Sequence, residues 1–263
     1  MTDSKLVLTL PDSEPVQYEK NFIKSAVCEL RFPTLLKYEK EPPVQLQSEI
    51  RKEYPLYEAQ QSLNVSTVTM GKEQRYLFRS RKKDWLVSFK ADSLALEANA
   101  YTGFSDFAKR FEWILSKSKR LLDTDFFTRV GLRYVNEIPI EDKNLDGWIN
   151  PDLIVPVVKG VYGTVLHFVQ EVRGHTTNGN YTFRHGSLST EQSDQVTYSL
   201  DFDFYKEDVP FDSVLPLISD FNVQAFRFFG WATGHKIVKR MGKAEPRRNV
   251  NANASYWKTS FIL

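Results

Sequence analysis

The fold is decided by the stretch Phe126-Phe-Thr-Arg-Val-Gly-Leu-Arg-Tyr-Val-Asn-Glu-Ile-Pro-Ile140, whose residues alternate as a β-strand requires. Its first face carries Val130, Leu132, Tyr134, Asn136 and Ile138, and its second face carries Arg129, Gly131, Arg133 and Val135. Because the first face is mostly apolar, we expect it to be buried. Two arginines and a glycine predict that the second face is polar or is closely approached by another backbone.

The residues before this strand predict one strand, a short helix, an antiparallel meander and a long helix. The strand is Ser25–Phe32, the short helix lies within 41–54, and the meander comprises Leu63–Met70, Gln74–Arg79, Trp85–Lys90 and Leu94–Ala100. We expect side chains of Thr102-Gly-Phe-Ser105 to cap the long helix. Phe111 lies at the centre of its apolar stripe and should be buried.

The residues after the central strand predict the same order of elements again. One or two helical turns are expected at Pro151–Val158, followed by the strands Thr164–Gly174, Asn180–Leu188 and Gln195–Tyr205. A second long helix should begin near Asp212-Ser213 and stop near Gly234, with Phe221 at the centre of its buried stripe.

This order predicts an α+β fold of two similar halves, residues 21–125 and 126–234, with the helices on one face of the sheet. Each half is a strand, a short helix, a meander and a long helix, which we interpret as a degenerate duplication. The element order is analogous to those of the TATA-binding-protein and helix-grip folds, an analogy that carries no function. Residues 1–20 should form an N-terminal arm, and residues 235–263 a basic and then apolar C-terminal tail.

Composition predicts a soluble, folded protein. The chain has 263 residues and a formal net charge of +2, so charge alone indicates neither a nucleic-acid binder nor a membrane-surface protein. Cys28 is the one cysteine, which excludes an internal disulfide and fits a reducing cytosol; we expect its thiol to be buried. No signal peptide or membrane span is recognisable, so we expect a cytoplasmic location without membrane contact.

Three segments resemble the hallmarks of a known family. They are Ala26-Val-Cys-Glu-Leu-Arg-Phe-Pro33, the helix end Ile50–Pro55 and Arg129-Val-Gly-Leu-Arg-Tyr-Val-Asn136. They are similar to those of a sporadically distributed bacterial family of about this length, with CELRF and RxGLRYVN segments and no assigned activity. The resemblance covers residues 20–240. Because a patchy distribution is typical of antiphage-defence and toxin–antitoxin cassettes, the resemblance implies such a context, but it supplies no catalytic residues.

No motif predicts catalysis, a metal or a cofactor. Phosphate-binding glycine loops and nucleophile motifs are absent from the sequence. His175 and His185 could face each other across a hairpin as metal ligands with His167 nearby, or be ordinary hydrogen-bonded histidines. Asp201 and Asp203 share one face of a strand, where they could hold a divalent cation or line a solvated surface. A hydrolase with an unfamiliar site stays open as a third class of function.

Two basic clusters are candidate anion sites. Arg79, Arg81, Lys82 and Lys83 lie in a predicted hairpin turn beside aromatic residues, where they could grip phosphates or be ordinary turn residues. Arg129 and Arg133 could form a cradle for an anion. Alternatively, if the first strands of the two halves are neighbours, these arginines could form an ion-pair network with Glu29 and Arg31 that joins the halves.

The C-terminal segment is a candidate partner-binding element. Its apolar residues are Tyr256, Trp257, Phe261, Ile262 and Leu263. Such a density of apolar side chains indicates docking on this chain or on another one. We therefore expect a non-catalytic binding or assembly protein that contacts another protein or itself, within a bacterial defence or toxin-control cassette. The alternative is a nucleic-acid or nucleotide sensor that uses the basic hairpin and the arginine-lined strand face.

Overall fold

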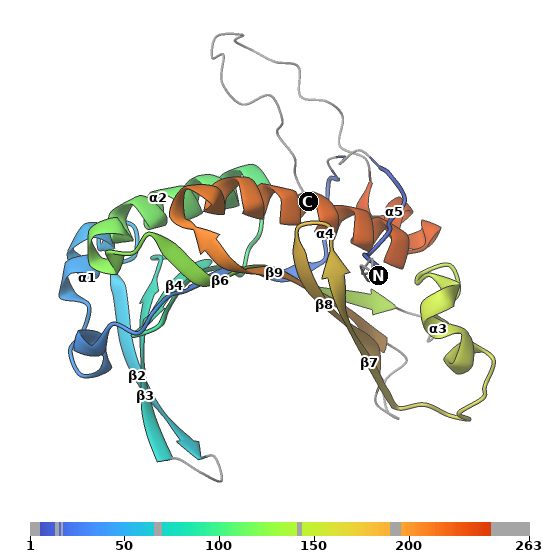
Figure 1. Ribbon diagram of the computed structural model, residues 1–263. Helices are drawn as coiled ribbons and strands as arrows, with labels where there is room; N and C mark the ends of the chain where they lie inside the picture. The colour runs from blue at the N-terminus through green and yellow to red at the C-terminus, as the bar shows by residue number, and fades with distance from the viewer. Residues whose placement is uncertain are drawn as a thin grey trace.

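A nine-stranded antiparallel sheet forms the centre of the molecule. The structure, a computed structural model, describes residues 6–13, 16, 18–65, 70–140, 144–189 and 196–242 (Figure 1). The strands are β1 (Ile23–Arg31), β2 (Leu56–Val65), β3 (Met70–Arg79), β4 (Trp85–Lys90), β5 (Ser93–Ala98), β6 (Phe126–Ile140), β7 (His167–Thr176), β8 (Gly179–Ser189) and β9 (Val196–Pro210). Their order across the sheet is β2-β3-β4-β5-β1-β6-β9-β8-β7.

Two long helices cover one face of the sheet. The helices are α1 (Val44–Ile50), α2 (Phe104–Leu122), α3 (Pro151–Val158), α4 (Val214–Ala232) and α5 (His235–Met241). The sheet bends into an arch, with α2 and α4 lying side by side on its convex side (Figure 1). The opposite, concave side is called the open face below. The fold is therefore α+β. Separately, no helix in the described ranges is long and apolar enough to cross a membrane.

The central strand β6 has the bounds predicted for it and joins the two parts of the sheet. It pairs with β1 on one side, where Cys28 lies opposite Leu132, and with β9 on the other, where Phe204 lies opposite Leu132. Its first face is buried as predicted, including Asn136, whose amide donates to the Leu200 carbonyl at 3.3 Å. Since β1 and β6 are neighbours, the N-terminal and C-terminal strands form one continuous sheet.

The core lies between the sheet and the helices and is rich in aromatic rings. Phe111 of α2 and Phe221 of α4 are 1% and 0% exposed, which confirms the burial predicted for both. The Tyr134 hydroxyl of β6 donates to Asn222 of α4 at 2.8 Å, so a buried polar pair ties the central strand to a covering helix. Cys28 is buried as expected, and burial raises the pKa of its thiol well above the ordinary value.

Three details differ from the sequence prediction. The first strand of the meander begins at Leu56 rather than Leu63, because residues 56–61 are exposed on both faces and lack the alternation that marks a half-buried strand. The N-cap of α2 is Gly103, and no side chain caps that helix. Residues 235–241, expected in the tail, form α5, whose Ile237 and Met241 belong to the core.

Candidate binding surfaces

Arg129 lies flat across Gly131 on the open face of β6. A Cβ atom at Gly131 would be 2.6 Å from the Arg129 Nη1 atom, so the glycine leaves the space that the guanidinium occupies. The guanidinium donates to Asp203 of β9 at 2.8 Å and to Glu29 of β1 at 3.4 Å, and its Cζ lies 4.5 Å from the centre of the Tyr205 ring. Arg129 thus links the strands on both sides of β6, and the close approach comes from a side chain, not from another backbone.

Ion pairs continue from β6 to the β7 edge of the sheet. Arg133 donates two parallel hydrogen bonds of 2.7 Å to the two carboxylate oxygens of Asp201 on β9. Asp201 also lies 3.6 Å from the Arg184 guanidinium of β8, and Arg184 in turn pairs with Glu171 of β7. Glu171 accepts a further hydrogen bond of 2.7 Å from Arg173. These pairs form a ladder of alternating charge across the open face.

The arginines of this ladder are neutralised by carboxylates of the same chain. Arg129 is only 18% exposed at its side chain, and burial raises the pKa of its partner Asp203 although Arg129 and Arg133 oppose that rise. An anionic ligand at Arg129 or Arg133 would have to displace Asp203 or Asp201. The geometry therefore favours the ion-pair network over the anion cradle, and Asp201 and Asp203 hold arginines rather than facing solvent freely.

The four cations of the basic hairpin fall into two groups, two that are exposed on the turn and two that line a pocket. The turn between β3 and β4 is held by backbone hydrogen bonds from Ser80 to the Trp85 carbonyl at 3.0 Å and from Lys83 to the Ser80 carbonyl at 2.9 Å. Arg81 and Lys82 are exposed on it. Arg79 and Lys83 instead line an open pocket.

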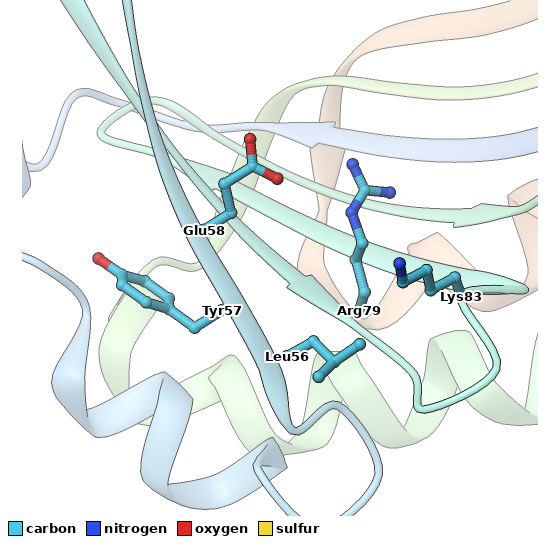
Figure 2. Close-up of a pocket in the computed structure, with 5 residues that line it drawn as sticks. All are labelled: Leu56, Tyr57, Glu58, Arg79 and Lys83. Atoms are coloured by element: carbon cyan, nitrogen blue, oxygen red, sulfur yellow. The ribbon is translucent and has the colours of Figure 1, made fainter.

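This pocket has a volume of about 450 Å³, and Figure 2 shows the residues around it. Its lining consists of Leu56, Tyr57 and Glu58 from β2, Arg79 from β3 and Lys83 from the turn. Glu58 and Arg79 rise from neighbouring strands, and the Lys83 side chain extends from the turn toward Arg79 (Figure 2). Within the described ranges, neither cation forms an ion pair with a carboxylate. The pocket therefore differs from the neutralised arginine ladder.

His175 and His185 do not face each other across the hairpin as a pair of metal ligands. In the register of β7 and β8, His175 lies opposite Asn180 and His185 lies opposite Gln170, so the two imidazoles occupy opposite faces of the sheet. His175 is exposed and contacts the Asn180 side-chain oxygen at 2.7 Å. Among the described residues, no group of three or more His, Cys, Asp and Glu side chains could hold a metal ion.

His185 is instead a buried member of the aromatic core. It is 1% exposed, and its ring stacks on Phe183 with the centres 4.9 Å apart. Its Nδ1 lies 2.8 Å from the Tyr198 hydroxyl, while its Nε2 has no hydrogen-bond partner. Because burial disfavours the charged imidazolium, the pKa of His185 is lowered to about 4.

The segment from α3 to β7 exposes a series of apolar side chains, and we call this segment the α3–β7 flank. Its exposed side chains are Val155, Val158, Val161, Tyr162, Leu166, Val169 and Val172. Val161 and Tyr162 are 68% and 61% exposed. Sequence analysis missed this surface, because a run of valines is normally interpreted as core. One feature of the sequence could have indicated this exposure. The apolar helix has only eight residues, with Pro156 inside it, and so short a helix does not bury all its faces.

The predicted partner-binding residues Tyr256, Trp257, Phe261, Ile262 and Leu263 lie outside the described residues. Comparison of the chain with protein-family models and with curated proteins gave no match.

Proposed function

We propose that this protein is a non-catalytic binding or assembly protein that contacts a protein partner through its α3–β7 flank. The observation that carries the proposal is the concentration of exposed apolar side chains between Val155 and Val172. Scattered apolar residues are normal on a protein surface, but a group of them marks an interaction site. The partner is another protein or a second copy of this chain.

The position of β7 adds to this proposal. Within the described ranges β7 is the last strand of the sheet, and its His175 carbonyl accepts a backbone hydrogen bond of 2.8 Å from Leu8 of the N-terminal segment. Such an edge offers N–H and C=O groups to an extended segment of a partner, and alternate side chains give the contact its specificity. Val169 and Val172 lie on this edge strand, both exposed. A partner strand could therefore combine backbone hydrogen bonds with apolar contacts.

The C-terminal segment with Tyr256, Trp257 and Phe261 is a second proposed contact, because its aromatic and aliphatic residues suit a groove or an edge strand. The family resemblance adds the proposed setting, a cytoplasmic antiphage-defence or toxin-control cassette. In such a setting, a subunit that joins other proteins would need surfaces of this kind.

We also propose that the fold arose by duplication of one half, with the element order of the TATA-binding-protein and helix-grip folds. Supporting this, β1 and β6 are neighbours at the centre, each followed outward by the last strand of its meander, β5 and β9. The helices α2 and α4 that follow these strands have 19 residues each. The strand β2 has no counterpart between α3 and β7 in the described structure.

The proposal is tested with a variant that carries Val158→Ser, Val161→Ser and Val169→Ser. The matched control carries Leu36→Ser and Val44→Ser, which remove apolar side chains that are 74% and 61% exposed outside the flank. Both variants should keep the fold within about 0.5 kcal/mol, because exposed positions tolerate such changes.

The readouts are sedimentation velocity of the purified chains and the amount of co-purifying partner from cells that express them. We expect the flank variant to lose self-association or the partner, and the control to keep it. Equal loss in both variants, or no loss in either, would contradict the proposal.

A further inference from the structure

The pocket at the other edge of the sheet has a chemistry that the α3–β7 flank does not share. We infer that the pocket formed by Leu56, Glu58, Arg79 and Lys83 binds a phosphate monoester that also carries hydroxyl groups, such as a sugar phosphate or a mononucleotide. Its volume of about 450 Å³ is within the range of small-molecule sites, roughly 300–1,000 Å³. The inference is independent of the proposed protein contact.

Arg79 supplies a guanidinium that pairs with no carboxylate of the described residues. In the strand register, Arg79 lies opposite Leu56 on β2 and opposite Leu86 on β4, so it stands between two leucines on the open face. Leu86 is 5% exposed, whereas Leu56 is 40% exposed and lines the pocket. A guanidinium is a strong donor to phosphate, because its planar fork matches two phosphate oxygens.

Lys83 lines the same pocket and has an unusual backbone conformation. Its φ is 61°, in the left-handed region that side-chain-bearing residues seldom adopt. Such a conformation costs free energy and tends to occur where a side chain must be placed for function. The neighbouring cations Arg81 and Lys82 lie in the same turn but do not line the pocket. Arg81 and Lys82 can therefore serve as controls for Lys83 of the same turn and for Arg79 at the end of β3.

Glu58 determines which kind of anion fits. One of its carboxylate oxygens accepts a hydrogen bond of 2.7 Å from the Gln60 amide, and no described residue donates to the other oxygen. With Arg79 and Lys83, the lining carries two cations and one carboxylate. A phosphate monoester has a charge of about −1.5 to −2 at neutral pH, which matches the two cations. A hydroxyl group on the same ligand can donate to Glu58, and its carbon skeleton can contact Leu56.

The experiment is isothermal titration of the full chain with ribose 5-phosphate, AMP, inorganic phosphate and ribose. We expect binding of ribose 5-phosphate that is stronger than that of inorganic phosphate, and no binding of ribose. Tighter binding of AMP would assign the site to nucleotides, and equal or weaker binding of AMP would assign it to sugar phosphates. No binding of any phosphate at millimolar concentration by the unaltered chain would overturn the inference.

Arg79→Gln and Lys83→Gly are the test variants, and Arg81→Gln and Lys82→Gln are the controls with the same change of charge. Loss of a charged hydrogen bond should weaken binding roughly ten- to hundred-fold in each test variant, and the controls should stay within about two-fold. Lys83→Gly relieves the left-handed backbone, so its melting temperature should not fall. That variant separates loss of binding from loss of folding.

Glu58→Gln should weaken ribose 5-phosphate more than inorganic phosphate, because only the sugar has hydroxyl groups to donate. Equal weakening by all four cation variants would overturn the inference, since it would show a diffuse electrostatic effect. Steeply salt-dependent binding of a single-stranded oligonucleotide, with no binding of the monoesters, would also overturn it and would favour nucleic acid.

Discussion

Substitution of Gly131 by alanine should destabilise the protein through Arg129 alone. The new Cβ would lie 2.6 Å from Arg129 Nη1 and 3.1 Å from its Cζ. The guanidinium would have to retreat by about 1 Å to reach ordinary van der Waals separation. Such a retreat would lengthen and weaken its hydrogen bonds to Asp203, at 2.8 Å, and to Glu29, at 3.4 Å.

The size of the effect follows from the interactions that Arg129 makes. A hydrogen bond between charged groups contributes roughly 1.5–3 kcal/mol, and the contact with the Tyr205 ring about 0.5–1 kcal/mol. Because the Asp203 contact is the shorter and less exposed one, we expect Gly131→Ala to cost about 2–3 kcal/mol. In an Arg129→Ala background the same substitution should be neutral or stabilise by roughly 0.4–1 kcal/mol, since alanine restricts the unfolded chain and suits an extended backbone.

Urea unfolding of the four proteins, followed by far-ultraviolet circular dichroism at pH 7, measures this coupling. The double-mutant cycle should give an interaction energy of about 2 kcal/mol or more between positions 129 and 131. The reasoning would be refuted if Gly131→Ala cost the same with and without Arg129. That result would mean that the new Cβ at position 131 clashes with the backbone or with another side chain, not with Arg129.

Four further predictions concern stability, metals and the tail. His185 has a pKa of about 4 in the folded state and an ordinary pKa of about 6.5 in the unfolded chain. The unfolded chain therefore binds the proton first as the pH falls, and the free energy of unfolding should decrease by up to about 3 kcal/mol between pH 6.5 and pH 4. In His185→Gln, urea midpoints measured across that range should lose this slope. Phe111→Ala and Phe221→Ala should each cost roughly 3–5 kcal/mol in urea unfolding, and a loss below about 1 kcal/mol would speak against their central packing. EDTA should leave the melting temperature unchanged in calorimetry, whereas a fall that zinc or magnesium restores would reveal a metal site. Deletion of residues 249–263 should leave the circular dichroism spectrum intact but weaken self-association or partner binding; an unfolded product would instead make the segment part of the core.

Sequence patterns predicted the elements that are buried on one face. β6 was predicted with its bounds because Val130, Leu132, Tyr134 and Ile138 alternate with polar residues along it. The long helices followed from apolar stripes for the same reason. In contrast, residues 56–61 of β2 are exposed on both faces, so no alternation distinguishes them from a loop.

The binding surfaces were harder to predict from the sequence, because they depend on strand register and on solvent exposure. The sequence suggested that Arg129 and Arg133 could pair with acids, and the neighbouring position of β1 supports that interpretation for Glu29. It could not indicate Asp203 as a partner, because this contact requires the register of β6 with β9. The sequence also placed Arg79, Arg81, Lys82 and Lys83 in one cluster, and only the fold separates the pocket cations from the turn cations.

The central claim, that the α3–β7 flank contacts a protein, is tested most directly by site-specific photo-crosslinking. A benzophenone amino acid is introduced at Val161, which is 68% exposed on the flank, and in a control at Leu36, which is 74% exposed elsewhere. After irradiation of cells that express each chain, the account predicts one discrete protein adduct from position 161, with a second copy or another protein, and none from position 36. No adduct from position 161, or the same adducts from both positions, would contradict it.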